Sequence, residues 1–253
     1  MTTLDAPSGA SIGHRIGWPR TVALHLGPGA AAFAVALLLA PVMHAWRLPA
    51  GFGLTVAFAL VLTPLELGLL LRAANRATGR WSVREIRTVL AYPRRLGPIW
   101  LLVPVLFAFA LVAAVVWSPA GAAIGDHLAG IYPDWTLPGY DDTAGLARPV
   151  LVATALGTLA IDGIVNPIVE ELWFRGYLLP RMPVTGLAAA PWSAGLFAVQ
   201  HYWQPYNWPL IFGLQVVIVA LVLRLRCLRL GVVMHVLANT FGAVLTLSAV
   251  LAA

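Results

Sequence analysis

The sequence predicts an all-α membrane protein, a polytopic bundle of about seven transmembrane helices with a range of six to eight. Hydrophobic residues make up 60% of the 253 residues and charged residues only 10%, whereas soluble domains carry roughly 45–50% apolar and about 25% charged residues. Apolar runs of about 20 residues recur along the chain, which is the length that crosses a bilayer as a helix. Most of the sixteen arginines lie between these runs.

The predicted spans follow one another along the whole chain. They cover 29–46, 50–71, 98–117, a fourth from about Pro149 toward Arg175 and Arg181, then 187–203, 208–223 and 231–253. Pro167 lies inside the fourth span and lacks a backbone N–H, so it can break that span into two shorter helices. The span count is therefore open by one, and we expect broken or tilted helices around an intramembrane polar site.

Three parts are expected within this single bundle. Residues 1–28 form a polar N-terminal lead with several glycines and prolines, 29–148 hold the first spans and their loops, and 149–253 hold the helices that carry the polar site. The lead has no charged segment followed by a cleavable small-residue site, so the first apolar run is read as a retained span and not as a signal peptide.

The charges alternate from one connection to the next. Arginine is abundant near the N-terminus and in 72–95, 175–181 and 224–229, whereas 118–148 carries Asp126, Asp134, Asp141 and Asp142 against Arg148 alone. Cytoplasmic loops of membrane proteins are rich in Lys and Arg, so the N-terminus is predicted to be cytoplasmic. The excess of arginine thus sets the orientation of the chain in the lipid bilayer, which is its expected surroundings. Nucleic acid is not an expected partner. The absence of lysine, together with abundant Ala, Gly and Pro, indicates that the chain comes from a GC-rich bacterium. The predicted location is therefore the bacterial inner membrane.

Cys227 is the only cysteine. An intramolecular disulfide and a thiolate metal cluster are therefore both excluded.

The most informative stretch is Asn166–Tyr177, where charge occurs inside an apolar run. Glu170, Glu171 and Arg175 lie there, and an ionisable residue within a membrane span indicates a functional site. Glu171 and Arg175 are four residues apart and share a helix face, with the acid in the favourable N-terminal position. Glu170 lies about 100° around the helix from Glu171. Arg175 can therefore orient Glu171 while Glu170 points into the bundle.

Two later helices supply further polar groups at the same four-residue spacing. Phe197 and His201 form one pair, and His235 and Asn239 form the other. Glu170 lies about as far before the turn near residue 185 as His201 lies after it, so the two return to similar depth at about 1.5 Å per residue. A desolvated carboxylate and a histidine can deprotonate a water molecule, and a second histidine with an asparagine can stabilise a tetrahedral oxyanion.

Other interpretations of these residues remain open from the sequence. His201, His235 and Glu170 could instead ligate a divalent metal such as zinc, with one open position. The acidic cluster could be a charge cluster in the headgroup zone, and the histidine and asparagine could be interhelical hydrogen-bond partners. Glu66 and Asp162 are expected to be structural polar residues. The competing class is a non-enzymatic membrane protein, a transporter or an immunity scaffold, although the chain lacks the repeated halves that many transporters show.

Three motifs in this order resemble the CAAX-protease and bacteriocin-processing (CPBP, or Abi) family of intramembrane proteases. They are Glu-Glu-x-x-x-Arg at 170–175, Phe-x-x-x-His at 197–201 and His-x-x-x-Asn at 235–239. The resemblance covers roughly 150–245 and implies an intramembrane endopeptidase acting on a membrane-associated protein or peptide.

The resemblance also implies a role for each matched residue. Glu170 and His201 would activate the attacking water, His235 and Asn239 would form the oxyanion site, and Glu171 and Arg175 would orient the first motif. The family has been assigned both metallo-type and glutamate-type mechanisms. Prenylated CAAX proteins are the substrates of its eukaryotic branch and need not be those of this chain. The metal dependence and the substrate therefore stay open.

Overall fold

The computed structural model describes residues 14–141 and 143–252, and most of these are helical. Residues 1–13 of the predicted lead, Asp142 of the acidic loop and Ala253 at the end of the last predicted span lie outside the described residues. The described ranges contain no β-strand, only isolated bridges between Pro93 and Cys227 and between Ala129 and Tyr132. The all-α prediction is confirmed.

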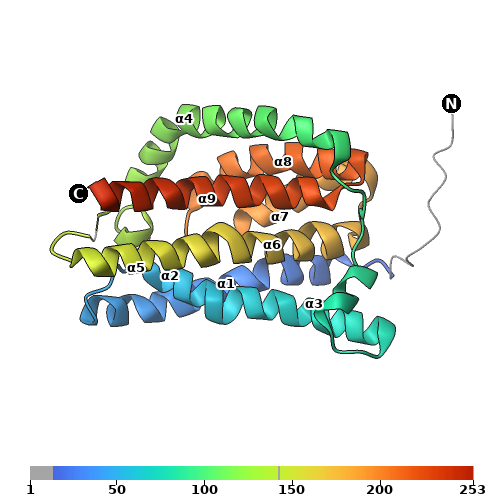
Figure 1. Ribbon diagram of the computed structural model, residues 1–253, viewed down its shortest axis with the longest axis horizontal. Helices are drawn as coiled ribbons and strands as arrows, with labels where there is room; N and C mark the ends of the chain where they lie inside the picture. The colour runs from blue at the N-terminus through green and yellow to red at the C-terminus, as the bar shows by residue number, and fades with distance from the viewer. Residues whose placement is uncertain (1–13, 142, 253) are drawn as a thin grey trace.

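The helices lie side by side along one direction, as Figure 1 shows. Their bounds are α1 (Trp18–Ala45), α2 (Phe52–Ala57), η1 (Phe58–Leu62), α3 (Thr63–Thr78), η2 (Val83–Thr88), η3 (Gly97–Leu102), α4 (Val103–Leu128), η4 (Asp134–Thr136), α5 (Arg148–Thr158), η5 (Leu159–Val165), α6 (Asn166–Glu170), η6 (Glu171–Leu178), η7 (Leu179–Arg181), η8 (Gly186–Ala188), α7 (Ala189–Val199), η9 (Pro205–Asn207), α8 (Trp208–Leu225) and α9 (Leu228–Ala252). Of these, η1, η5 and η6 are π-helical, and the other η segments are 3₁₀ turns.

Six continuous helical stretches within the described residues are long and apolar enough to cross a membrane. They are Trp18–Ala45, Phe52–Thr78, Gly97–Leu128, Arg148–Arg181, Pro205–Leu225 and Leu228–Ala252. Six lies within the predicted range, and the chain is an integral membrane protein.

The predicted fifth span, 187–203, is shorter than a membrane crossing. The helical residues of this region are η8, which begins at Gly186, and α7, which ends at Val199. Together they rise only about 20 Å, against a hydrocarbon core of about 30 Å. The α7–α8 hairpin turns back part-way along the bundle, while α5 and α9 extend further toward the left of Figure 1. The polar turn 200–207 thus lies within the bundle and not at its end.

Three predicted helix ends are wrong. The second span continues to Thr78 instead of ending at 71. α1 begins at Trp18 instead of 29, so the described part of the predicted lead is helical from Trp18 onward, and it continues through Pro28 and Pro41. The third span continues past Pro119 to Leu128 instead of ending at 117. Each internal proline removes one backbone hydrogen bond, and neighbouring groups in a membrane helix can compensate for that loss.

Pro167 does not break the fourth span. The helix is continuous from Arg148 to Arg181, and the π-helical segment η5 ends immediately before α6, which has Pro167 in its first turn. Local π-helical turns re-satisfy backbone groups that a proline leaves free. A second π-helical segment, η6, begins at Glu171, and such wide turns are frequent at functional sites.

The helix formed by η5, α6 and η6 is the centre of the bundle. α9 packs along all three of its segments, and α3 packs against α6 and η6. Trp173, Phe174 and Leu178 of η6 form a buried cluster with Phe197 of α7 and Leu70 of α3. This packing holds the two glutamates at a defined depth, surrounded by helices.

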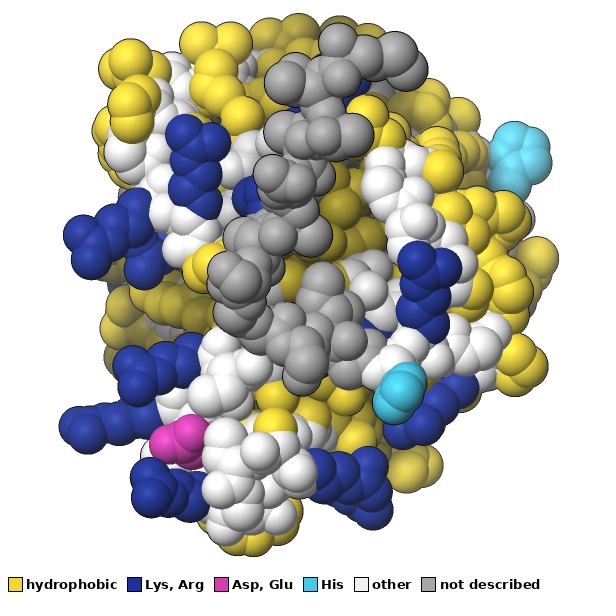
Figure 2. Space-filling view, turned by 90° about the vertical axis from the view of Figure 1, so that its right-hand side faces the viewer, with side chains coloured by type: hydrophobic (Ala, Val, Ile, Leu, Met, Phe, Trp, Pro, Cys, Tyr) yellow, Lys and Arg dark blue, Asp and Glu magenta, His cyan; other side chains and the backbone are white. Residues whose placement is uncertain are grey.

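The arginine-rich connections meet at one end of the bundle. The loop 79–96 and the turns 182–185 and 226–227 lie toward the right of Figure 1, and the loop 129–147 lies at the opposite end. Seen from that right-hand end, arginine side chains gather around the face and acidic ones are scarce (Figure 2). The alternation of charge along the sequence thus places the basic connections at one end of the molecule and the acidic loop at the other.

Candidate active site

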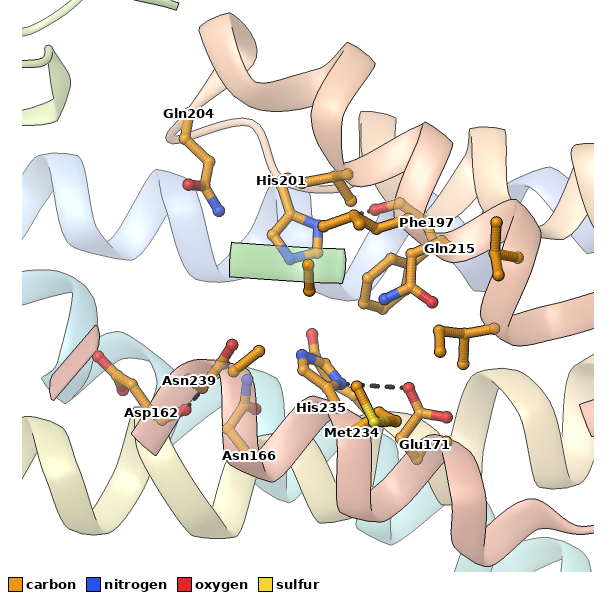
Figure 3. A pocket seen from close by; sticks show the side chains of 18 of the residues that line it. Asp162, Asn166, Glu171, Phe197, His201, Gln204, Gln215, Met234, His235 and Asn239 are labelled. Carbon is orange, nitrogen blue, oxygen red and sulfur yellow. Dashed lines mark hydrogen bonds and ion pairs between the residues drawn. The ribbon is translucent and has the colours of Figure 1, made fainter. Parts of the chain in front are cut away.

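One cavity of about 320 Å³ gathers most of the predicted site residues. It lies between α4, the central helix, the α7–α8 hairpin and α9, and Figure 3 shows its polar side chains facing one another. The polar residues that line it are Asp162, Asn166, Glu170, Glu171, His201, Gln204, Gln215, His235 and Asn239. Of the predicted set, only Arg175 does not line the cavity.

Arg175 lies behind Glu171 and forms the predicted i,i+4 ion pair with it. Arg175 Nη1 is 3.2 Å from Glu171 Oε1, and both side chains are fully buried. The guanidinium carbon also lies 3.8 Å from the centre of the Phe197 ring, and Nη2 donates a hydrogen bond to Gln215 Oε1. The guanidinium is thus held by an ion pair, a hydrogen bond and an aromatic ring, although its Nε has no hydrogen-bond partner within the described residues.

His235 lies between the two glutamates. Its Nδ1 is 3.2 Å from Glu171 Oε1, and its Nε2 is 3.7 Å from Glu170 Oε2. Because the Glu171 carboxylate is paired with Arg175 and can only accept, Nδ1 of His235 donates in this contact. Glu171 therefore connects Arg175 to His235, a link that helical spacing within one segment could not predict.

Glu170 is held by a residue outside the predicted set. Gln200 Nε2 donates to Glu170 Oε1 at 3.0 Å, and both side chains are buried. Gln200 belongs to none of the three motifs, and only the fold places it next to Glu170. A Cβ atom at Gly29 would collide with the backbone and side-chain oxygens of Gln200, so the glycine lets α1 approach closely enough to enclose this amide.

His201 faces the cavity from the opposite side to His235 (Figure 3). Its Nδ1 is 2.7 Å from the carbonyl oxygen of Phe197. A carbonyl oxygen only accepts, so Nδ1 carries the proton, and Nε2 of the neutral ring keeps a lone pair. Trp208 Nε1 donates to the His201 carbonyl at 3.0 Å, which ties the start of α8 to this turn. His201 is therefore arranged to accept a proton through Nε2.

Asn239 lies on the same helix as His235 and is anchored to the central helix. Its Nδ2 donates to the carbonyl oxygen of Asp162 at 3.0 Å, which uses one of the two N–H groups of the amide. Asp162 faces the cavity, and its Oδ2 accepts a hydrogen bond from Thr55 at 2.7 Å, whereas its Oδ1 has no partner within the described residues. Glu66, by contrast, is fully buried, and neither of its carboxylate oxygens has a hydrogen-bond partner within the described residues.

The alternative metal set was His201, His235 and Glu170. Among residues 14–141 and 143–252, no group of three His, Cys, Asp or Glu side chains is placed to hold a metal ion. The side chains in this arrangement do not fit a three-ligand metal site.

Residues 152–241 match the model of the family described as Type II CAAX prenyl endopeptidase Rce1-like. The matched segment contains all six predicted site residues, so the resemblance predicted from the three motifs is confirmed. No curated protein and no solved structure matches the chain.

Proposed function

We propose, on the premise that residues 152–241 are an Rce1-like endopeptidase segment, that this integral membrane protein hydrolyses a peptide bond in a membrane-associated protein or peptide. The observation that carries the proposal is the single cavity lined by Glu170, His201, His235 and Asn239. These side chains come from three separate stretches of the chain and meet inside a bundle of apolar helices.

In the proposed mechanism, a water molecule in the cavity is activated between Glu170 and His201. Glu170 Oε2 is free of the Gln200 hydrogen bond, and His201 Nε2 keeps its lone pair. As the water oxygen attacks the scissile carbonyl carbon, its proton passes to one of these two bases. The same proton then reaches the leaving nitrogen as the carbon–nitrogen bond breaks.

The developing oxyanion is bound by His235 and Asn239. Nδ1 of His235 donates to Glu171, so Nε2 donates into the cavity when the ring carries both protons, and Asn239 offers its second N–H. Glu171 and Arg175 do not contact the substrate in this mechanism. Their ion pair orients the His235 ring. Donors that are fixed before the reaction need no reorganisation as negative charge develops on the carbonyl oxygen.

The test compares protein termini in membranes of cells that make the wild-type chain or Glu170→Gln. Mass spectrometry should find new termini with the wild type only, and His201→Ala and His235→Ala should abolish cleavage without loss of membrane insertion. Asp126→Asn, which changes an exposed acid, is the matched control and should cleave normally. Wild-type processing by purified Glu170→Gln would show that the mechanism is wrong. A transporter or an immunity scaffold would produce no new termini at all.

Metal dependence is tested separately. Because the donors do not form a three-ligand group, we expect purified enzyme to keep its activity after prolonged chelation, with no stoichiometric metal in elemental analysis. Activity that is lost on chelation and restored by zinc would contradict this expectation.

The orientation in the membrane is part of the proposal. The arginine-rich end would face the cytoplasm, with the N-terminus on the same side, in a bacterial inner membrane. Single cysteines placed in the loop 129–147 should then react with an impermeant reagent added outside intact spheroplasts, whereas cysteines in 79–96 should not. The reverse labelling pattern would invert the orientation.

A further inference from the structure

A second, smaller hollow of about 150 Å³ lies behind the central helix at the arginine-rich end. Arg20 of α1 and Arg72 and Arg76 of α3 line it, and Trp173 and Tyr177 of η6 form its inner wall. None of these five residues touches the catalytic cavity. Three cations from two helices thus face one concave surface of η6.

No ion pair among the residues that the structure describes compensates the positive charge of this hollow. Every ion pair within the described ranges involves Glu171 with Arg175, or His235 with one of the two glutamates. Arg20, Arg72 and Arg76 therefore form none there, and their mutual repulsion favours a bound anion. Arginine presents a planar fork of donors that matches phosphate oxygens.

The inner wall of the hollow is held in place by ring stacking and hydrogen bonds. The Trp173 and Tyr177 rings are stacked, with their centres 5.2 Å apart and their planes inclined by only 9°. The guanidinium carbon of Arg181 lies 4.1 Å from the Tyr177 ring centre, and its Nη1 donates to the Tyr177 carbonyl at 2.8 Å. Trp173 Nε1 donates to the carbonyl oxygen of Leu24 on α1 at 3.2 Å. This wall connects α1 to η6 and adds a fourth cation nearby.

The helix surface next to the hollow changes from basic to apolar. Leu65, Leu69, Arg72 and Arg76 follow one another at spacings of three or four residues, so they form one stripe along α3. Leu65 is 40% exposed, and Leu69 lines the hollow itself. A ligand that fits this stripe has a negatively charged head and an apolar tail. The stripe, basic at one end and apolar along the rest, therefore suits a lipid and not a small soluble anion.

We propose that this hollow binds the phosphate group of an anionic phospholipid, whose acyl chains run along the Leu65–Leu69 side of α3. The three arginines contact the phosphate. A zwitterionic lipid carries a positive choline beside its phosphate and has no net charge, so it would not neutralise the arginines. Basic pockets between transmembrane helices on the cytoplasmic side bind acidic lipid head groups in this way. A bound lipid ties α1 and α3 to the outer side of η6, the segment whose inner side carries Glu171.

The test measures lipid binding by the purified protein and does not involve cleavage, so it stands apart from the proposed function. The full chain is reconstituted with phosphatidylglycerol or phosphatidylcholine, extracted in mild detergent and weighed by native mass spectrometry. The variants are Arg72→Gln with Arg76→Gln, and Arg20→Gln on the other helix. Arg80→Gln with Arg84→Gln is the matched control, because these exposed arginines lie at the same end outside the hollow.

We expect the wild type and the control to retain one phosphatidylglycerol molecule and no phosphatidylcholine. At about 1 kcal/mol for each basic residue, removing both arginines of α3 should weaken retention about 30-fold, and Arg20→Gln should weaken it about fivefold. Equal losses in the α3 variant and in the control would overturn the proposal, because the attraction would then belong to the whole basic end. Equal retention of both lipids, or displacement of the lipid by millimolar inorganic phosphate, would overturn the assignment to an anionic lipid.

Discussion

The buried ion pair between Glu171 and Arg175 makes a quantitative prediction about stability. Arg175→Met removes the guanidinium that lies 3.2 Å from Glu171 Oε1 and 3.8 Å from the Phe197 ring centre, and it also leaves Gln215 without its donor. The methionine fills most of the same volume. The main consequence is therefore a fully buried carboxylate whose remaining partner is Nδ1 of His235.

Removing one partner of a buried pair destabilises a protein by about 3–5 kcal/mol, because the other charge stays uncompensated. The same principle predicts recovery when both charges are removed. In Glu171→Gln with Arg175→Met, the amide oxygen of Gln can still accept from His235, and no charge is left unpaired. We expect this double variant to lose less than about 2 kcal/mol, since replacing a buried pair by apolar or neutral groups is often close to neutral.

The assay is reversible unfolding in mixed micelles, followed by tryptophan fluorescence as the denaturing detergent increases. Arg224→Met is the matched control, an exposed arginine on α8 whose loss should change the free energy of unfolding by less than about 0.5 kcal/mol. A single variant as stable as this control, or a double variant less stable than the single one, would refute the reasoning.

Two further predictions concern the rate of cleavage. Gly231→Ala should lower kcat about 100-fold, because the new methyl group would collide with the Glu171 carboxylate and a displacement of about 1 Å within a site can cost that much. Gly242→Ala on the same helix is the control: its methyl group meets nothing within 4 Å, so this variant should cleave normally. Equal rates in the two variants would contradict the role of Glu171. Asn239→Ala should lower kcat about 10²–10³-fold by removing an oxyanion donor, while the free energy of unfolding falls by only about 1 kcal/mol for the hydrogen bond to Asp162. An unchanged kcat would remove Asn239 from the oxyanion site.

Much of the fold follows from composition and periodicity. Long apolar runs separated by arginines predicted a polytopic helical bundle, and the structure confirms it. The errors occurred at helix ends and in α7. Pro167 was expected to be able to break its span because it lacks a backbone N–H, but the π-helical segment η5 precedes it and the helix continues to Arg181.

The predicted span 187–203 is apolar enough to suggest a crossing, and nothing in its periodicity shows that it stops short. The helix α7 ends at Val199. In the turn that follows, Gln200 donates to Glu170 and the His201 ring donates back to the Phe197 carbonyl. The partner of the first bond is thirty residues away in sequence. No local pattern can report such a contact.

The sequence by itself determined which residues carry charge inside the membrane and which of them share a helix face. The Glu171–Arg175 pair is of this kind, because a spacing of four residues brings side chains together within one helix. The tertiary structure alone decided that Gln200 holds Glu170 and that His235 bridges both glutamates. It also decided that Gly29 leaves room for Gln200 and Gly231 for Glu171. These contacts join separate helices, and their geometry depends on how deep each helix lies and how it is rotated in the bundle. Those quantities are set by the packing of the whole chain.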